Sequence, residues 1–177
     1  MGILDTIIDT HQKESLQQFE LNLIITKILE PLREREKSIL SKRYGLHGEE
    51  MQTLKTVGEE QGLTRERVRQ IENSALSLIR KSDLFKNEKA VFEELKTLIH
   101  TLGAIVGEQD LLGHLSKDPL TQNHIHLYLT LGDEFTKHKE DDHFKTRWSV
   151  DSAISEQIHT SLKNLYANLT DDELVPE

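Results

Sequence analysis

The chain has 177 residues, no cysteine and a formal net charge of −9, and 36% of its residues are hydrophobic. This composition is typical of an intracellular protein with one large or two small domains, and two small domains fit better. The lack of cysteine excludes disulfides and the thiolate zinc sites of many DNA-binding modules. No apolar run approaches the ~20 residues of a membrane span, and the apolar start at residues 3–8 lacks the features of a signal peptide. We therefore expect a cytoplasmic protein with no membrane partner.

The first 44 residues are predicted to be helical. Residues 2–10 could form a short helix, and a longer helix is predicted from Lys13 to Leu32, ended by Pro31. A third helix is expected from Glu34 to Tyr44, where Gly45 stops it. We treat residues 1–26 as an N-terminal helical extension.

Residues 53–81 have the pattern of two helices joined by a short turn, which is a helix-turn-helix. Thr53 is the expected N-cap of the first helix, and Gly62 supplies the left-handed residue at its end. Gly58 lies inside this helix, where glycine costs about 1 kcal/mol relative to alanine, so we expect the second helix to pass close to it. Thr64 is the expected N-cap of the second helix.

The second helix has an apolar side and a polar side. At about 100° per residue, the side expected to face the core carries Val68, Ile71, Ala75, Leu78 and Ile79. The opposite side carries Glu66, Arg69, Gln70 and Asn73. Arginine can donate a pair of hydrogen bonds to guanine, glutamine can pair with adenine, and glutamate can accept from cytosine. Arg65 and Arg67 flank this side and would lie over phosphates. The alternative is an ordinary solvated surface of mixed charge.

The same residues carry a resemblance to a known family. LTRERVRQIE at 63–72, preceded by TLKTVGEEQG and by LREREKSILSKRYGL at 32–46, resembles region 4 of the sigma-70 family of bacterial sigma factors, which binds the −35 promoter element. The resemblance covers about 27–81. It implies base contacts by Arg65, Glu66, Arg69 and Gln70, and backbone contacts by Arg67 and by the helix start at Thr53 and Leu54. It also implies two partners, which are double-stranded promoter DNA and the flap of the catalytic subunit of RNA polymerase core.

Two features depart from a simple sigma factor. After Glu72 the family usually continues with lysine and arginine, whereas this chain has Asn73, Ser74, Ser77 and Leu78. The aromatic segments that melt the −10 element are missing. The resemblance also leaves two roles open for Leu29, Leu32 and Leu40, which either dock on polymerase or fill the small core.

The charge is segregated along the chain. Residues 27–81 hold 12 Lys and Arg against 9 Asp and Glu, a net charge of +3, and the remainder holds 10 against 22, a net charge of −12. An acidic body repels DNA and weakens non-specific binding. We therefore expect weak DNA binding by the chain alone, or binding aided by a protein partner.

The pattern after residue 82 predicts a winged-helix-like domain. Following a candidate linker at 82–86, a helix (87–102), a short strand (103–106) and a second helix to Leu115 are expected. A third helix, capped by Asp118 or Thr121, precedes a hairpin that turns at 140–143. This third helix carries no Lys or Arg, so any nucleic-acid contact would come from Lys137, Lys139, Lys145 and Arg147 on the hairpin. A protein-binding or spacing role fits this domain better.

The fold class we predict is mainly α, with a region 4-like helix-turn-helix domain (27–82), a winged-helix-like α+β domain (83–150), and a C-terminal helix with an acidic tail (151–177). We find no catalytic motif and no metal or cofactor site, and we expect the histidines to be core or solvated residues. Two hypotheses follow. The first is a sequence-specific transcription factor for a −35-type element that also contacts RNA polymerase. The alternative is a regulator that binds polymerase or another protein with little DNA contact, in which the acidic C-terminal half has a further protein partner.

Overall fold

The computed structural model describes residues 21–168, and the predicted helix at 2–10 and the start of the predicted helix from Lys13 lie outside them. The first part of the chain is helical, as predicted. Its elements are α2 (Leu21–Leu29), α3 (Glu34–Tyr44), α4 (Leu54–Gln61) and α5 (Arg65–Lys81). Gly45 ends α3 with a φ of 60°, a left-handed conformation that suits glycine.

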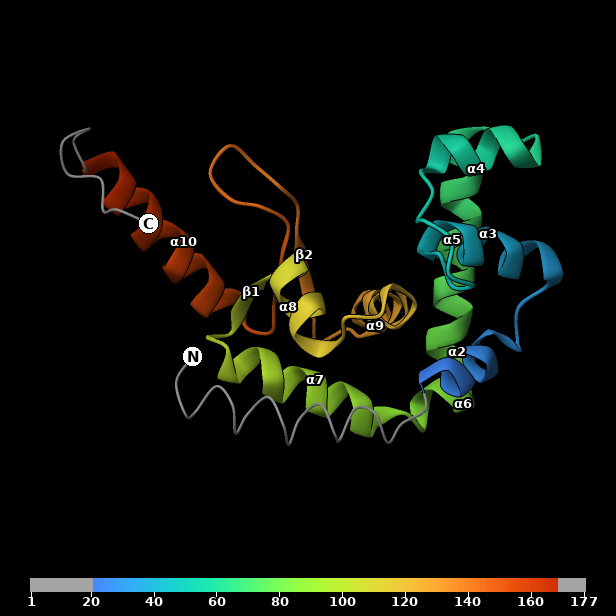
Figure 1. The fold of residues 1–177 in the computed structure, drawn as a ribbon, viewed down its shortest axis with the longest axis horizontal. Coiled ribbons are helices and arrows are strands. Elements are labelled where there is room, and N and C mark those ends of the chain that lie inside the picture. The colour runs from blue at the N-terminus through green and yellow to red at the C-terminus, as the bar shows by residue number, and fades with distance from the viewer. Residues whose placement is uncertain (1–20, 169–177) are drawn as a thin grey trace.

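Helices α3, α4 and α5 enclose a small core of their own. Ile39, Val57 and Val68 are fully buried there, and Leu54, Leu63 and Ile71 pack around them half-buried. Figure 1 shows α4 lying across one end of α5, which is the arrangement of a helix-turn-helix. The predicted helix-turn-helix is confirmed.

The second part combines helices with a small sheet in the predicted order. Its elements are α6 (Asp83–Lys86), α7 (Lys89–Thr101), β1 (Ile105–Gly107), α8 (Glu108–Leu115), α9 (Pro119–Leu131), β2 (Thr136–His138), β3 (Arg147–Ser149) and α10 (Ser152–Asn168). The strands are antiparallel in the order β1-β3-β2, and Trp148 of β3 pairs with Val106 on one side and Lys137 on the other. Asp118, one of the two predicted caps, begins α9 by accepting from the Thr121 backbone at 2.9 Å. The mainly α fold class is confirmed.

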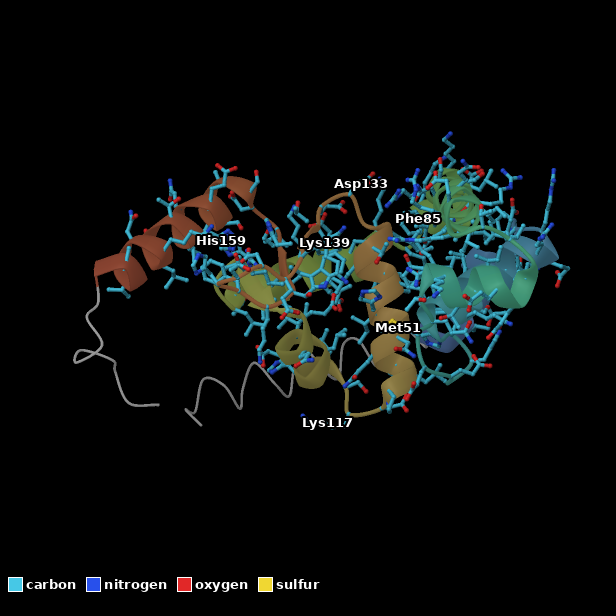
Figure 2. The ribbon with its side chains drawn as sticks, turned by 90° about the horizontal axis from the view of Figure 1, so that it is seen from above. Met51, Phe85, Lys117, Asp133, Lys139 and His159 are labelled. Carbon is cyan, nitrogen blue, oxygen red and sulfur yellow. The ribbon has the colours of Figure 1, made fainter. Side chains whose placement is uncertain are left out.

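Helix α9 joins the two parts of the molecule. It is seen end-on in Figure 1, between α5 and α8, and in Figure 2 it runs between Lys117 and Asp133. One hydrophobic core, shared by both parts, extends from Ile28 of α2 through Leu40 and Leu76 to Tyr128 of α9 and Trp148 of β3. The helix-turn-helix is therefore packed against the rest of the chain.

Polar contacts fix both ends of α9 on the first part. The Asn123 amide donates to the Gly45 carbonyl at 3.0 Å, and His124 Nε2 lies 3.1 Å from the Leu46 carbonyl. At the other end Arg80 donates to the carbonyls of Thr130 and Leu131. These bonds give the packing a defined register.

The candidate linker at 82–86 is wrong. Ser82 ends α5 and caps the short helix α6 by accepting from the Phe85 backbone at 3.2 Å. Phe85 packs against the shared core, and its ring centroid lies 4.9 Å from that of Phe92. This apolar contact holds the connection between α5 and α7 in place. The polar composition of residues 82–86 predicted a linker because it does not show that Phe85 is packed against the core. The division at residue 82 stays a prediction.

The outer elements of the second part are exposed. Figure 1 shows α10 at the opposite side of the molecule from α4 and α5. His159 of α10 and Lys139 of the hairpin lie on the α10 side of α9 in Figure 2. Within residues 21–168, no helix has the length and apolar character needed to cross a bilayer.

Candidate nucleic-acid interface

The turn of the helix-turn-helix is held by two caps and two glycines. Thr53 Oγ1 accepts from the Thr56 backbone at 3.1 Å, and Thr64 Oγ1 accepts from the Arg67 backbone at 3.2 Å. Gly62 has a φ of 64°, as the predicted left-handed end of α4 requires. A Cβ on Gly58 would lie 2.7 Å from the Leu63 carbonyl oxygen, so the close approach comes from the turn just before α5. The caps and glycines thus fix the angle between the two helices.

The polar side of α5 faces solvent, as predicted. Arg65, Glu66, Arg67, Arg69, Gln70 and Asn73 are all exposed, and so is Thr53 at the start of α4. Leu54 is half-buried and packs on the small core. The predicted contact residues therefore lie on two elements that α3 and the turn hold together. Their role in DNA binding stays a prediction.

The exposed side chains on this side of α5 bond to one another. Arg69 donates to both Glu66 oxygens, at 2.8 and 2.7 Å, and Arg67 donates to the Gln70 side-chain oxygen at 3.2 Å. The hydrogen bond from Arg69 lowers the pKa of Glu66, so the carboxylate stays ionised at neutral pH. All of these groups can exchange their partners for base edges or phosphates without the cost of uncovering a buried charge.

The apolar side of α5 is rotated from its predicted position. Leu78, assigned to the core, is 44% exposed, whereas Leu76 is 6% exposed and Glu72 is 7% exposed. The reason is that α9 packs against the later turns of α5, on the side of Leu76 rather than of Leu78. Periodicity places residues around a helix axis, but it does not say on which side a distant segment packs.

Glu72 is the residue that sequence reasoning missed. Arg43 Nε of α3 donates to Glu72 Oε1 at 3.2 Å, and Arg43 Nη1 donates to the Gln52 carbonyl just before α4. Tyr44 also lies beside this carboxylate, and burial and the Glu72 charge raise the pKa of its hydroxyl. A charged residue next to an expected core stripe was the only available signal, because Arg43 is 29 residues away in sequence.

The second part of the chain offers little basic surface. Seven of the thirteen residues of α9 are buried, and five of these belong to the shared core, so α9 cannot enter a groove. Two of the four hairpin cations are used internally, since Lys137 Nζ lies 2.6 Å from Glu108 and Arg147 lies 3.1 Å from Asp141. Lys139 and Lys145 remain exposed, next to exposed Glu140 and Asp142. The predicted nucleic-acid contact through the hairpin therefore has a weak electrostatic basis.

Four histidines of the second part of the chain are buried or bonded within the fold. His124 is 2% exposed and His126 is 9% exposed, both within α9. Arg147 Nε donates to His159 Nε2 at 2.6 Å, and His138 Nε2 lies 2.8 Å from Ser149 Oγ. Between residues 21 and 168 no group of three His, Asp or Glu side chains is arranged to hold a metal ion.

The comparison with known families bears directly on this site. Residues 28–81 match the family model "Sigma-70, region 4", and this range spans the end of α2 and all of α3, α4 and α5. We call residues 28–81 region 4, after the family model that they match. Region 4 thus covers the helix-turn-helix and all the predicted contact residues, and its match ends where α5 ends.

Curated proteins similar to this chain are sigma factors. The RNA polymerase sigma factor RpoD of Helicobacter pylori is 41% identical over 68 residues, which are 38% of this chain and 10% of the relative. The RNA polymerase sigma factor RpoS of Coxiella burnetii is 40% identical over 82 residues, which are 45% of this chain and 23% of the relative. The RNA polymerase sigma factor sigB of Arabidopsis thaliana is 47% identical over 51 residues, 29% of this chain and 9% of the relative. The chain thus matches at most about a quarter of the length of these relatives.

Proposed function

We propose that this protein is a sequence-specific transcription factor whose region 4 recognises a −35-type promoter element in the major groove. The observation that carries the proposal is the exposed side of α5, where Arg69, Glu66 and Gln70 present base-reading groups on a helix fixed by Thr64. Arg65 and Arg67 flank these groups and would contact phosphates, as would the start of α4 at Thr53 and Leu54. Asn73 extends the same side by one turn. The protein would act on DNA in the cytoplasm, without catalysis.

Contact with RNA polymerase core is the second part of this proposal. The similarity of region 4 to sigma factors that are named for RNA polymerase supports it. The acidic remainder of the chain weakens binding to DNA alone, so a polymerase partner would supply the missing affinity. Leu29, Leu32 and Leu40 are buried in the core shared with α9, so a flap contact through these three side chains would require α9 to move away.

The alternative is a regulator that binds polymerase or another protein with little DNA contact. The exposed apolar residues of α10 favour it, because Leu162 is 36% exposed and Leu165 is 54% exposed on an otherwise acidic half. A protein partner for this half would cover them.

Selection of bound DNA from a random pool, at stated salt and with or without polymerase core, tests the proposal. A −35-like motif enriched in either arm supports sequence recognition, and a motif that appears only with core also supports the polymerase contact. Polymerase binding that survives alanine at Arg65, Arg69 and Gln70, with no motif enriched in either arm, would instead support the alternative.

A further inference from the structure

Glu72 lies on the side of α5 that carries the buried residues Val68, Ala75 and Ile79, so it is not available to DNA. At about 100° per residue it lies about 20° from Arg65 around the helix axis, two turns further along. Arg65 is exposed, whereas the Glu72 side chain is 10% exposed because it bonds to Arg43 of α3, which packs against α5 (Figure 1). The base-reading surface of α5 therefore ends where the contact with α3 begins.

Arg43 connects Glu72 to the start of α4. Its Nε donates to the Glu72 carboxylate at 3.2 Å, and its Nη1 donates to the Gln52 carbonyl. Gln52 comes directly before Thr53, the N-cap of α4. A planar guanidinium holds its donors in a fixed fork, so it sets the direction between its two acceptors as well as their distance.

The small core around these helices does not set that direction by itself. Ile39, Val57 and Val68 are its only fully buried side chains in the part of the chain that the structure covers. Apolar burial is proportional to area and has no preferred direction, whereas hydrogen bonds depend on angle. The caps and glycines set the angle at the turn, and Arg43 adds a directional contact away from the turn that restrains the rotation of α5 relative to α4.

We propose that Arg43 and Glu72 are positioning residues for DNA recognition, which hold the base-reading helix α5 and the phosphate-contacting start of α4 in one fixed orientation. This inference rests on the proposed function of region 4. Neither side chain touches DNA. Their effect on binding is therefore expected in sequence discrimination, which depends on the alignment of several side chains, and less in the salt dependence, which counts phosphate contacts.

The first test compares Glu72→Ala with Glu72→Gln and with the control Glu59→Ala, an exposed glutamate of α4. The ratio of affinities for selected and scrambled DNA is measured at a temperature where circular dichroism shows every variant folded. Glu72→Ala is expected to lower this ratio about tenfold or more, which is the effect of misplacing one good base contact. Glu72→Gln keeps an acceptor oxygen for Arg43 and should recover most of the lost affinity ratio.

An affinity ratio that is unchanged in folded Glu72→Ala overturns the proposal. If Glu72→Ala does not fold, Arg43→Lys replaces it, because a lysine cannot hold both acceptors.

The second test needs no DNA. The chain has no cysteine, so Lys55→Cys on α4 and Ser74→Cys on α5, both at exposed positions, provide two unique sites for spin labels. The distance distribution between the labels should be narrow in the parent background, broadened or shifted with Glu72→Ala, and restored with Glu72→Gln. An unchanged distance distribution contradicts the positioning role of Arg43 and Glu72. If the parent protein shows no DNA preference, the proposed function fails, and this measurement alone then decides whether Arg43 and Glu72 set the orientation.

Discussion

Arg80 makes two charge-assisted hydrogen bonds between region 4 and the second part of the chain. Its Nε donates to the Leu131 carbonyl at 2.9 Å and its Nη2 donates to the Thr130 carbonyl at 2.7 Å, and it lies 3.6 Å from Asp133. The last carbonyls of a helix have no partner within the helix, so Arg80 satisfies two such groups of α9. A hydrogen bond from a charged donor contributes about 1.5–3 kcal/mol, and the half-buried position of Arg80 favours the lower end of this range. We therefore expect Arg80→Ala to lower the free energy of unfolding by about 2–3 kcal/mol.

Urea unfolding measures this loss. Trp148 is the only tryptophan and lies in the core shared with region 4, so its fluorescence reports on the second part while circular dichroism reports on the helices of both. Because the core is shared, the two signals should give one coincident transition in the parent protein. Lys81→Ala, at an exposed neighbouring position, is the control and should change the free energy by less than about 0.5 kcal/mol. An Arg80→Ala effect no larger than this control would refute the reasoning, and so would two separate transitions in the parent protein.

Three further predictions address the interface and the pH dependence. Arg69→Ala should weaken binding to the selected DNA about 5- to 150-fold and relax preference at one base position, whereas Arg67→Ala should weaken all sequences alike and flatten the salt dependence; titrations at several salt concentrations separate them, and equal losses on every sequence for both would contradict the assignment. Gly58→Ala should lower the melting temperature despite the better helix propensity of alanine, because the new Cβ would lie 2.7 Å from a backbone oxygen; a rise would mean that the turn relaxes. Burial opposes ionisation of Glu108, but hydrogen bonds from His126 and Lys137 and their charges outweigh it and lower its pKa from 4.5 to about 2. Because this folded-state pKa is below the unfolded value, stability from Glu108 is present above pH 4.5 and is lost as pH falls toward 2, and Glu108→Gln should reduce this pH dependence in urea titrations.

Local signals were enough to find the helix-turn-helix. Thr53 and Thr64 act as N-caps and Gly62 takes the left-handed conformation, as their types and positions predict, because each depends only on its own turn of backbone. The exposed side of α5 followed from periodicity alone for the same reason.

Contacts between distant segments could be found only in the tertiary structure. No pattern in the sequence indicates that α9 packs on region 4, that Leu76 replaces Leu78 in the core, or that Glu72 meets Arg43. Periodicity determines which residues share a side of a helix, whereas the partner of that side depends on how the whole chain fills its core. For this protein the sequence by itself determined helix α5 and its outward residues, and the tertiary structure decided what holds that helix in place.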